Sequence, residues 1–216
     1  MKYEELVKGI RAYEEPIAIA ECIYFKALEK LKDIEYDLNK LNEEEVKEII
    51  AAFLILWGRM GRTVDRKDMN WKELINQLRN LCSKDFFKKL KNKSLLSIDE
   101  SDGDAIKRAY NSIRVKYIGP TAKSKILHLL NPKVFVMWDE AIRKKYKVKG
   151  TATGYLKFLR RMKKELEEAL GEKRKWDEEK IVKEICKNLS SEELRKECTR
   201  KTLAKLIDEY NWASTH

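Results

Sequence analysis

The chain has 216 residues, of which 43% are hydrophobic and 38% are charged, and its formal net charge is +11. That apolar fraction, together with five Trp, nine Tyr and six Phe, excludes an intrinsically disordered chain. Only eight glycines and three prolines are present, which argues against a turn-rich β-sandwich. An all-α fold in one compact unit, residues 1–216, is predicted.

The sequence lacks the features of a membrane or secreted protein. Its most apolar run, residues 49–57, is too short to cross a bilayer, and its first residues do not resemble a secretory signal. The four cysteines are widely spaced and form no CxxC pair, so we expect four free thiols, mostly buried, and no metal site. A single glutamine among many Lys and Glu residues is typical of thermophilic proteins. We therefore expect a cytoplasmic monomer from a prokaryote, archaeal or thermophilic, without a membrane partner.

Apolar residues recur at helical spacing through most of the chain. After Pro16, a first helix has one apolar face, made of Ile17, Ala20, Tyr24, Leu28 and Leu31. Asn42 is the predicted N-cap of the next helix, whose apolar stripe reaches Trp57 and which ends at Gly58 and Gly61. Further helices are predicted over residues 71–82, 84–92, 104–116, 121–130, 140–146, 153–170, 177–189 and 191–210. Residues 134–137 are expected to be extended, as a loop through the core.

Positive charge is concentrated in the middle of the chain. Residues 104–149 contain twelve basic and three acidic residues, and residues 105–138 contain no acid, whereas residues 1–50 contain eight basic and thirteen acidic residues. A basic segment within a folded domain is typical of proteins that bind a polyanion, so double-stranded DNA is the expected partner. The alternative is a solvated face that the acidic N-terminal helices balance.

The segment from Tyr117 to Glu140 carries the most specific pattern. A helix rich in bases and aromatics ends near Tyr117, a Gly119-Pro120 turn follows, and a second helix begins at Thr121. After Asn131-Pro132 the apolar stretch leads to Asp139 at the start of another helix. Free backbone N–H groups at a helix N-terminus bind phosphate well, and Lys123 and Lys125 would lie beside them.

This order resembles the helix-hairpin-helix (HhH-GPD) DNA glycosylase superfamily, the all-α base-excision repair enzymes of the endonuclease III and 8-oxoguanine glycosylase type. There, a hydrophobic-Gly-x-Gly-x-Lys-x-Ala hairpin opens a helix, and an essential Asp follows about twenty residues later. Gly119 and Asp139 have this spacing. The resemblance covers roughly residues 104–150 and implies a two-lobed helical bundle that binds duplex DNA without a cofactor.

The position of the family's nucleophilic lysine has three readings in this sequence. Thr121 stands where the second hairpin glycine would be, and that alignment puts Lys123 at the lysine position. The Gly-to-Asp spacing puts Thr121 itself there, which would imply a monofunctional enzyme or none. The Ser124-Lys125-x-Leu127-His128 pattern also looks like a set of uncharacterised proteins distantly akin to the superfamily, and it favours Lys125.

The implied chemistry assigns roles to the residues around the hairpin. A damaged base is everted into a pocket, a carboxylate stabilises the cationic C1′, and a lysine forms a Schiff base. The resemblance makes Asp139 the carboxylate and Lys125 or Lys123 the nucleophile. The alternative for Asp139 is that it only caps a helix. Expected nucleic-acid contacts are Gly119, Thr121, Lys123, Arg59, Arg62, Arg143 and Lys144. The expected base pocket consists of Trp138, His128 and Trp57, for which the alternative is a place in the core.

The sequence thus predicts a DNA base-excision glycosylase with AP-lyase activity. A non-catalytic DNA-binding protein of the same scaffold is the main alternative, and a helical protein-interaction domain is a second. The site hypothesis requires Asp139 and a lysine amine to share one concave pocket.

Overall fold

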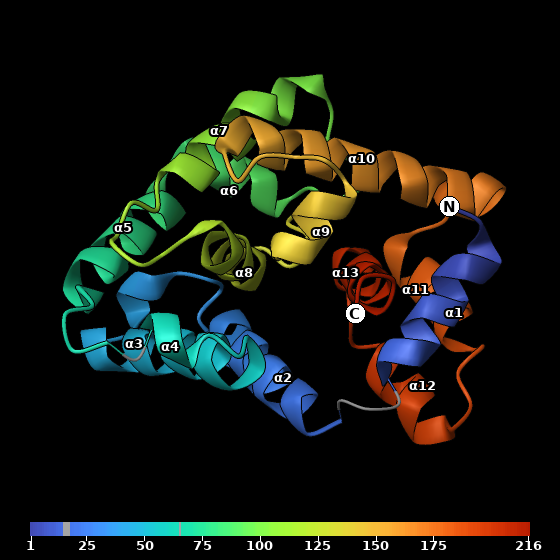
Figure 1. Ribbon diagram of the computed structural model, residues 1–216, viewed down its shortest axis with the longest axis horizontal. Coiled ribbons are helices and arrows are strands. Elements are labelled where there is room, and N and C mark those ends of the chain that lie inside the picture. Colours follow the sequence, from blue (N-terminus) through green and yellow to red (C-terminus); the bar gives the residue numbers. More distant parts are fainter. Residues whose placement is uncertain (15–17, 65) are drawn as a thin grey trace.

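The computed structural model describes residues 1–14, 18–64 and 66–216, apart from the side chains of residues 14, 18–20, 62 and 63. All regular secondary structure in these residues is helical, which confirms the all-α prediction (Figure 1). The start of the first predicted helix, at Pro16 and Ile17, lies outside the described residues, as does the side chain of Ala20.

The described helices and helical turns follow each other with short connections. The first half of the chain contains α1 (Tyr3–Glu14), α2 (Ala18–Asp33), η1 (Leu38–Lys40), α3 (Glu43–Ala52), the π-helical turn η2 (Phe53–Trp57), α4 (Gly61–Val64), α5 (Trp71–Ser83), α6 (Asp85–Lys91), η3 (Glu100–Asp102) and α7 (Gly103–Asn111). The second half contains α8 (Pro120–Leu130), α9 (Glu140–Lys145), α10 (Ala152–Leu170), η4 (Gly171–Lys175), α11 (Glu178–Cys186), α12 (Glu192–Cys198) and α13 (Leu203–Ala213).

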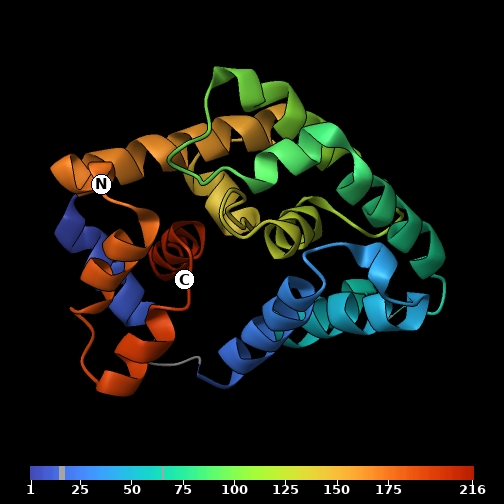
Figure 2. The same ribbon diagram turned by 180° about the vertical axis from the view of Figure 1, so that it is seen from behind.

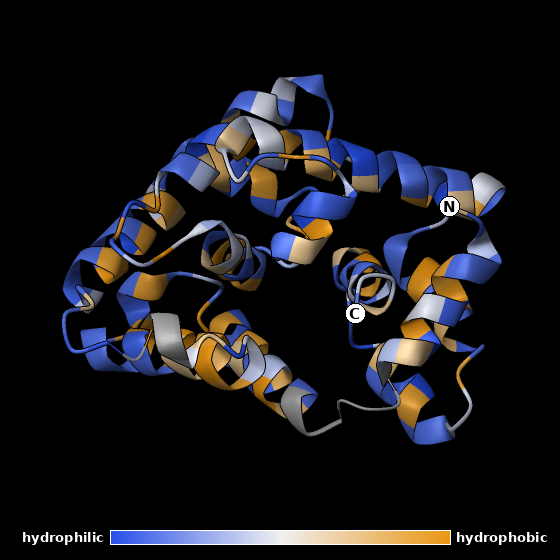
Figure 3. Ribbon diagram, in the orientation of Figure 1, coloured by the Kyte–Doolittle hydropathy of each residue, from blue (hydrophilic) through white to orange (hydrophobic). Residues whose placement is uncertain are grey.

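The helices gather in two groups that α10 spans. Helices α1, α11, α12 and α13 lie together at one end, and α2 to α8 lie at the other, with α9 between them (Figures 1 and 2). Helix α1 packs along α13, α10 packs along α7, and η2 packs on α2 and α3. Hydrophobic and hydrophilic residues alternate along each helix (Figure 3), as expected for helices with one buried face.

Local sequence explains where several helices begin. The Asn42 side chain accepts a hydrogen bond from the Glu45 backbone N–H (3.0 Å), and the Glu45 carboxylate accepts one from the Asn42 N–H (2.8 Å). This reciprocal capping confirms the predicted start of α3. The helix stays regular to Ala52 and widens into η2, which ends at Gly58, near the predicted end.

Two predicted helices are shorter or divided in the structure. The helix predicted over residues 104–116 ends at Asn111, because the chain turns away and the Arg114 N–H donates to the Gln77 side chain of α5 (2.7 Å). The helix predicted over residues 191–210 is two helices, α12 and α13. Thr202 caps the second, and its hydroxyl also donates to the Pro132 carbonyl (2.6 Å), which fixes the break.

The loop that carries the chain to Asp139 is buried, as predicted. Val134, Phe135 and Val136 are 0% exposed and Met137 is 1% exposed, although none of them belongs to a helix. Its backbone is held partly by side chains, because the Tyr155 hydroxyl donates to the Val136 carbonyl (2.8 Å). The loop therefore fixes the start of α9 against the core. In the described part of the chain, none of the helices combines the length and apolar character that crossing a membrane requires.

The expectation of four free thiols is wrong for one pair. Cys186, at the end of α11, and Cys198, at the end of α12, form a disulfide, whereas Cys22 is free and exposed and Cys82 is free and buried. A spacing of twelve residues has no disulfide signature of its own. The two thiols meet only because α11 and α12 fold back on each other.

We expect the Cys198→Ser substitution to lower the free energy of unfolding by about 3 kcal/mol, because the disulfide closes a short loop in the unfolded chain. Urea unfolding with and without reductant measures this loss. Cys22→Ser is the matched control and should leave stability unchanged. Equal stability of the wild-type protein under oxidising and reducing conditions would contradict a structural role of the disulfide.

Candidate functional site

A hollow of about 870 Å³ opens between the two groups of helices. Its wall comes from η2 and the loop behind it, the first turns of α8, the start of α9, and the last turns of α13. The residues that line it are Tyr13, Ile55, Trp57, Gly58, Arg59, Met60, Gly61, Thr121, Lys125, Met137, Trp138, Asp139, Ile142, Asp208, Trp212 and His216.

Lys125 places an amine in this hollow. Its Nζ donates to the Gly58 carbonyl (2.9 Å) and lies 5.2 Å from the centroid of the Trp57 ring. Burial lowers the pKa of Lys125, and the Asp208 and Asp139 carboxylates oppose this effect. A lysine with a lowered pKa is more often the neutral amine, the form that acts as a nucleophile.

Position 58 requires a glycine, because there is no space for a side chain. A Cβ at this position would lie 2.5 Å from the Leu54 carbonyl oxygen, which belongs to the backbone and cannot turn away. The close approach follows from η2, in which the Gly58 N–H donates to the Phe53 carbonyl (2.8 Å). The π-helical turn thus positions the carbonyl that holds Lys125.

Asp139 also lines the hollow and is half-buried. Its Oδ1 accepts from the Ile142 N–H (2.9 Å), so Asp139 is the N-cap of α9. Its Oδ2 lies 3.4 Å from Nε2 of His216, at the mouth of the hollow. One oxygen therefore stabilises the helix while the other stays beside the hollow, so the cap does not exclude chemistry.

Aromatic rings form much of the wall. Trp57 stacks in parallel on Phe53, with ring centroids 5.0 Å apart, and Trp212 stacks on His216 at the same separation. Trp138 also lines the hollow, although it is only 1% exposed and its Nε1 donates to the Pro120 carbonyl (3.0 Å). Trp57 and Trp212 can offer ring surface to a flat ligand, whereas Trp138 is mainly core.

His128, predicted in the base pocket, belongs to the core instead. It is 0% exposed, its Nδ1 lies 2.6 Å from the Phe135 carbonyl, and its Nε2 lies 2.8 Å from the Tyr24 hydroxyl. Burial lowers the pKa of His128 to about 3, so the ring stays neutral at physiological pH. Because the carbonyl can only accept, Nδ1 carries the proton and the tyrosine donates to Nε2. His128 ties α8 to α2 and to the buried loop.

Lys123, the other candidate nucleophile, does not line the hollow. Positions 123 and 125 are about 200° apart around a helix, so both amines cannot face the same side. The Lys123 Nζ lies 5.3 Å from the centroid of the Tyr110 ring, on the side of α8 that faces α7. Sequence alignment leaves both lysines as candidates for the nucleophile, whereas helix geometry places only one of them in the hollow.

The turn before α8 also differs from the predicted glycine bend. Gly119 has φ −80°, and a Cβ there would meet nothing within 4 Å, so another residue would fit. The left-handed residue of the turn is Tyr117 (φ 73°), whose hydroxyl donates to Asp68. Pro120 is the first residue of α8, so the helix does begin immediately after the turn, as predicted.

The predicted phosphate-binding residues occupy several places. Arg59 lines the hollow and has a left-handed backbone (φ 51°). Arg143 donates to the Thr121 hydroxyl (3.1 Å), which joins the start of α8 to α9, and Lys144 is exposed and paired with Glu140 (2.7 Å). The side chain of Arg62 lies outside the described residues.

Sequence reasoning missed the contribution of α13. Asp208, Trp212 and His216 line the hollow and are spaced four residues apart, so they share one face of the last helix and its end. The Asp-x-x-x-Trp-x-x-x-His spacing was visible in the sequence. The helix predicted over residues 191–210 stops short of Trp212 and His216, so the prediction does not place them on it.

A buried ion cluster lies under this face of α13. Lys201 and Lys205 both contact Oε1 of Glu209, at 2.7 and 2.6 Å, and they contact the carboxylate of Glu21 at 3.4 and 3.3 Å. All four side chains are at most 2% exposed. Burial alone would raise the pKa of Glu21, but the charges of Lys205 and Lys201 lower it to about 2. Glu21 also accepts from Nε1 of Trp57 (3.0 Å), which links the cluster to the hollow.

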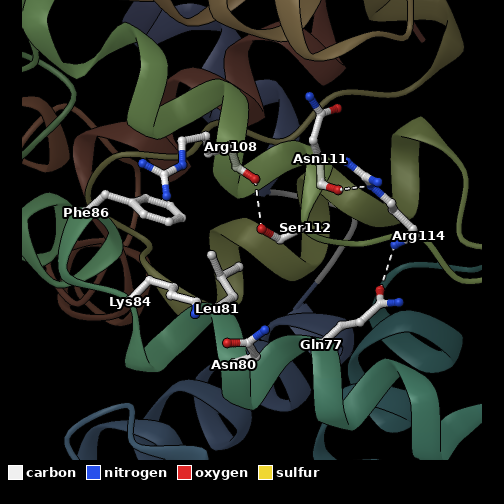
Figure 4. A pocket seen from close by; sticks show the side chains of 9 residues that line it. All are labelled: Gln77, Asn80, Leu81, Lys84, Phe86, Arg108, Asn111, Ser112 and Arg114. Atoms are coloured by element: carbon white, nitrogen blue, oxygen red, sulfur yellow. Dashed lines mark hydrogen bonds between the residues drawn. The ribbon is translucent and has the colours of Figure 1, made fainter.

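A second hollow, of about 420 Å³, lies between α5, α6 and α7 (Figure 4). The Arg108 guanidinium lies 4.2 Å from the centroid of the Phe86 ring, and Lys84 and Arg114 complete a basic wall. No carboxylate is among the residues that line it. Its composition suits anion binding, whereas the larger hollow pairs amines with acids.

Within the described ranges, no group of three or more His, Cys, Asp or Glu side chains is arranged to hold a metal ion. Comparison of the chain with models of protein families, with curated proteins and with solved structures finds no match.

We expect Lys205→Met to lower the free energy of unfolding by about 3 to 5 kcal/mol, because it leaves two buried carboxylates with one cation, Lys201, between them. Chemical denaturation measures the loss. Lys47→Met is the control, since Lys47 forms only an exposed pair with Glu44 on α3. If the two substitutions cost the same, the cluster does not hold α13 in place.

Proposed function

We propose that this protein is a DNA glycosylase of the helix-hairpin-helix type, with AP-lyase activity, that removes a damaged base everted from duplex DNA. The observation that carries the proposal is the presence of the Lys125 amine, with its lowered pKa, and the Asp139 carboxylate in the wall of one hollow. Both parts of the implied chemistry are thus available at one place.

The reaction uses these two groups in sequence. The neutral Lys125 amine attacks C1′ of the deoxyribose, the N–C1′ bond forms, and the glycosidic bond breaks with its electron pair moving to the base. The Asp139 carboxylate stabilises the positive charge that develops at C1′. The departing base takes up the proton that the attacking nitrogen loses. The C1′–O4′ bond then breaks, with its electron pair moving to O4′, which takes up a proton from water, and the nitrogen forms the double bond of a Schiff base. Loss of a proton from C2′ of this Schiff base expels the 3′ phosphate, which leaves with the electron pair of its C–O bond.

The size and lining of the hollow fit an everted nucleotide. A volume of about 870 Å³ accommodates a base and its sugar. Trp57 and Trp212 lie in its wall with one face stacked on Phe53 and on His216, respectively, so a base would stack on the other face. Base-aromatic stacking contributes roughly 1–3 kcal/mol, which helps to offset the cost of eversion.

The charge distribution supports duplex DNA as the partner. The basic segment 104–149 supplies helices α8 and α9, which border the hollow, and Arg59 approaches it from the other side. Backbone N–H groups at the start of α8 add a further site for a phosphate. This arrangement fits a two-lobed, monomeric glycosylase with DNA in the cleft between its lobes.

A thermophilic prokaryote remains the proposed source, and the cytoplasm the proposed compartment. The Cys186–Cys198 disulfide is compatible with this, because intracellular proteins of hyperthermophiles are often rich in disulfides.

Borohydride trapping on duplexes that contain an abasic site tests the lyase activity. We expect a covalent adduct with the wild-type protein and with Lys123→Gln, and no adduct with Lys125→Gln. The two lysines are on the same helix, so Lys123→Gln is a matched control for charge and helix stability. A screen of several modified bases at high temperature then identifies the substrate, and Asp139→Asn should lower excision by a factor of about 100 or more.

The alternative, a non-catalytic DNA-binding protein, gives a different result. It requires salt-sensitive DNA binding without an adduct on any abasic or damaged duplex, and no effect of Asp139→Asn beyond a loss of stability. A helical protein-interaction domain would not retain DNA at moderate salt.

A further inference from the structure

Asp208 is a buried acid that the proposed reaction does not yet use. It lies on α13, is 6% exposed, and lines the hollow. Among the described residues its carboxylate has no hydrogen-bond or ion-pair partner, although every other carboxylate near it has one. Its oxygens are not among the fully buried polar atoms without a partner, so the carboxylate faces the hollow and is available to a group there.

The charges around Asp208 come from several helices. Burial raises the pKa of Asp208 to about 7, Lys205 and Lys125 lower it, and Glu209 and Glu21 raise it. The charge of Asp208 also raises the pKa of three tyrosines: Tyr13 of α1, Tyr24 of α2 and Tyr155 of α10. Lys205 is already held by Glu209 and Glu21. Of the two cations that line the hollow, Lys125 and Arg59, Lys125 is the one that lowers the pKa of Asp208.

We infer that Asp208 is a positioning acid that acts through Lys125: both line the hollow, the charge of the Asp208 carboxylate steadies the Lys125 ammonium, and the carboxylate takes up, by way of water in the hollow, the proton that the amine must lose before it attacks C1′. The inference rests on the proposed function, since that reaction requires a neutral amine. In the transfer, the ammonium becomes an amine and the carboxylate becomes a carboxylic acid, so charge and protons balance.

Asp139 is less suited to this task. One of its oxygens is occupied by the Ile142 N–H, and the other lies beside His216 at the mouth of the hollow. Arg59 is a further nearby charge, and it lowers the pKa of Lys125. Asp208 raises the pKa of Lys125 more than Asp139 does, and none of the donors in the described part of the chain binds its oxygens. The two acids therefore have different roles: Asp139 stabilises the charge at C1′, and Asp208 acts on the Lys125 amine.

Competitive acetylation with trace acetic anhydride, followed by peptide mass spectrometry, measures the apparent pKa of Lys125 without DNA. We expect Asp208→Asn to lower that pKa by about one unit, because an amide no longer stabilises the ammonium. Asp208→Glu keeps the charge and should restore much of the effect. Asp104→Asn, at an exposed acid of α7 that pairs with Lys107, is the control and should change nothing.

An unchanged Lys125 pKa in folded Asp208→Asn protein would overturn the inference. If Asp208→Asn does not fold, the carbon-13 shift of the Asp208 carboxyl is followed in the wild type and in Lys125→Met. The pKa of Asp208 should then rise when the lysine charge is removed, and an unchanged value would overturn the inference equally.

The pH profile of trapping separates proton transfer from a purely structural role. With cyanoborohydride and abasic duplex, the wild-type rate should fall below about pH 7, where Asp208 becomes protonated, and Asp208→Asn should lack that inflection. A variant that keeps the inflection contradicts the inference. If the wild type forms no adduct at all, the proposed function loses its lyase step, while the acetylation result still decides whether Asp208 acts on Lys125.

Discussion

The buried ion cluster of Lys201, Lys205, Glu21 and Glu209 is the constraint on which the hollow depends. It attaches α13 to α2, and so joins the two groups of helices that α10 spans. Removing such charges from water is expensive, and their mutual contacts restore the balance only in one geometry. The main effect of the cluster is therefore to fix the position of α13, rather than to increase the free energy of unfolding.

That placement decides what the hollow can do. With α13 fixed, Asp208 and Trp212 face Lys125 and Trp57, which belong to helices of the other group. The Trp57 indole donates a hydrogen bond to Glu21 of the cluster, and the Lys125 amine donates one to the Gly58 carbonyl at the end of η2. A lysine amine, two carboxylates and two indole rings thus line one hollow, although they belong to elements that are far apart in the sequence. Their burial gives the amine and the second acid unusual proton affinities.

Helical periodicity and capping residues were sufficient to predict most of the fold. Asn42, the buried loop at residues 134–137 and the end of a helix at Gly58 follow from local chemistry, so the sequence alone indicates them. The break at Thr202, the disulfide and the end of α7 depend on distant partners, and no local pattern specifies these. The site shows the same division. Asp139 is visible as a cap at a recognisable spacing, whereas the choice between Lys123 and Lys125 and the role of Asp208 depend on tertiary packing.

Peptide mapping of the borohydride-reduced adduct with abasic duplex DNA tests the central claim most directly. The account predicts that the sugar remnant is attached to Nζ of Lys125 and to no other amine. An adduct on Lys123, on Lys205 or on the N-terminal amine would show that the hollow between the two groups of helices is not the catalytic site.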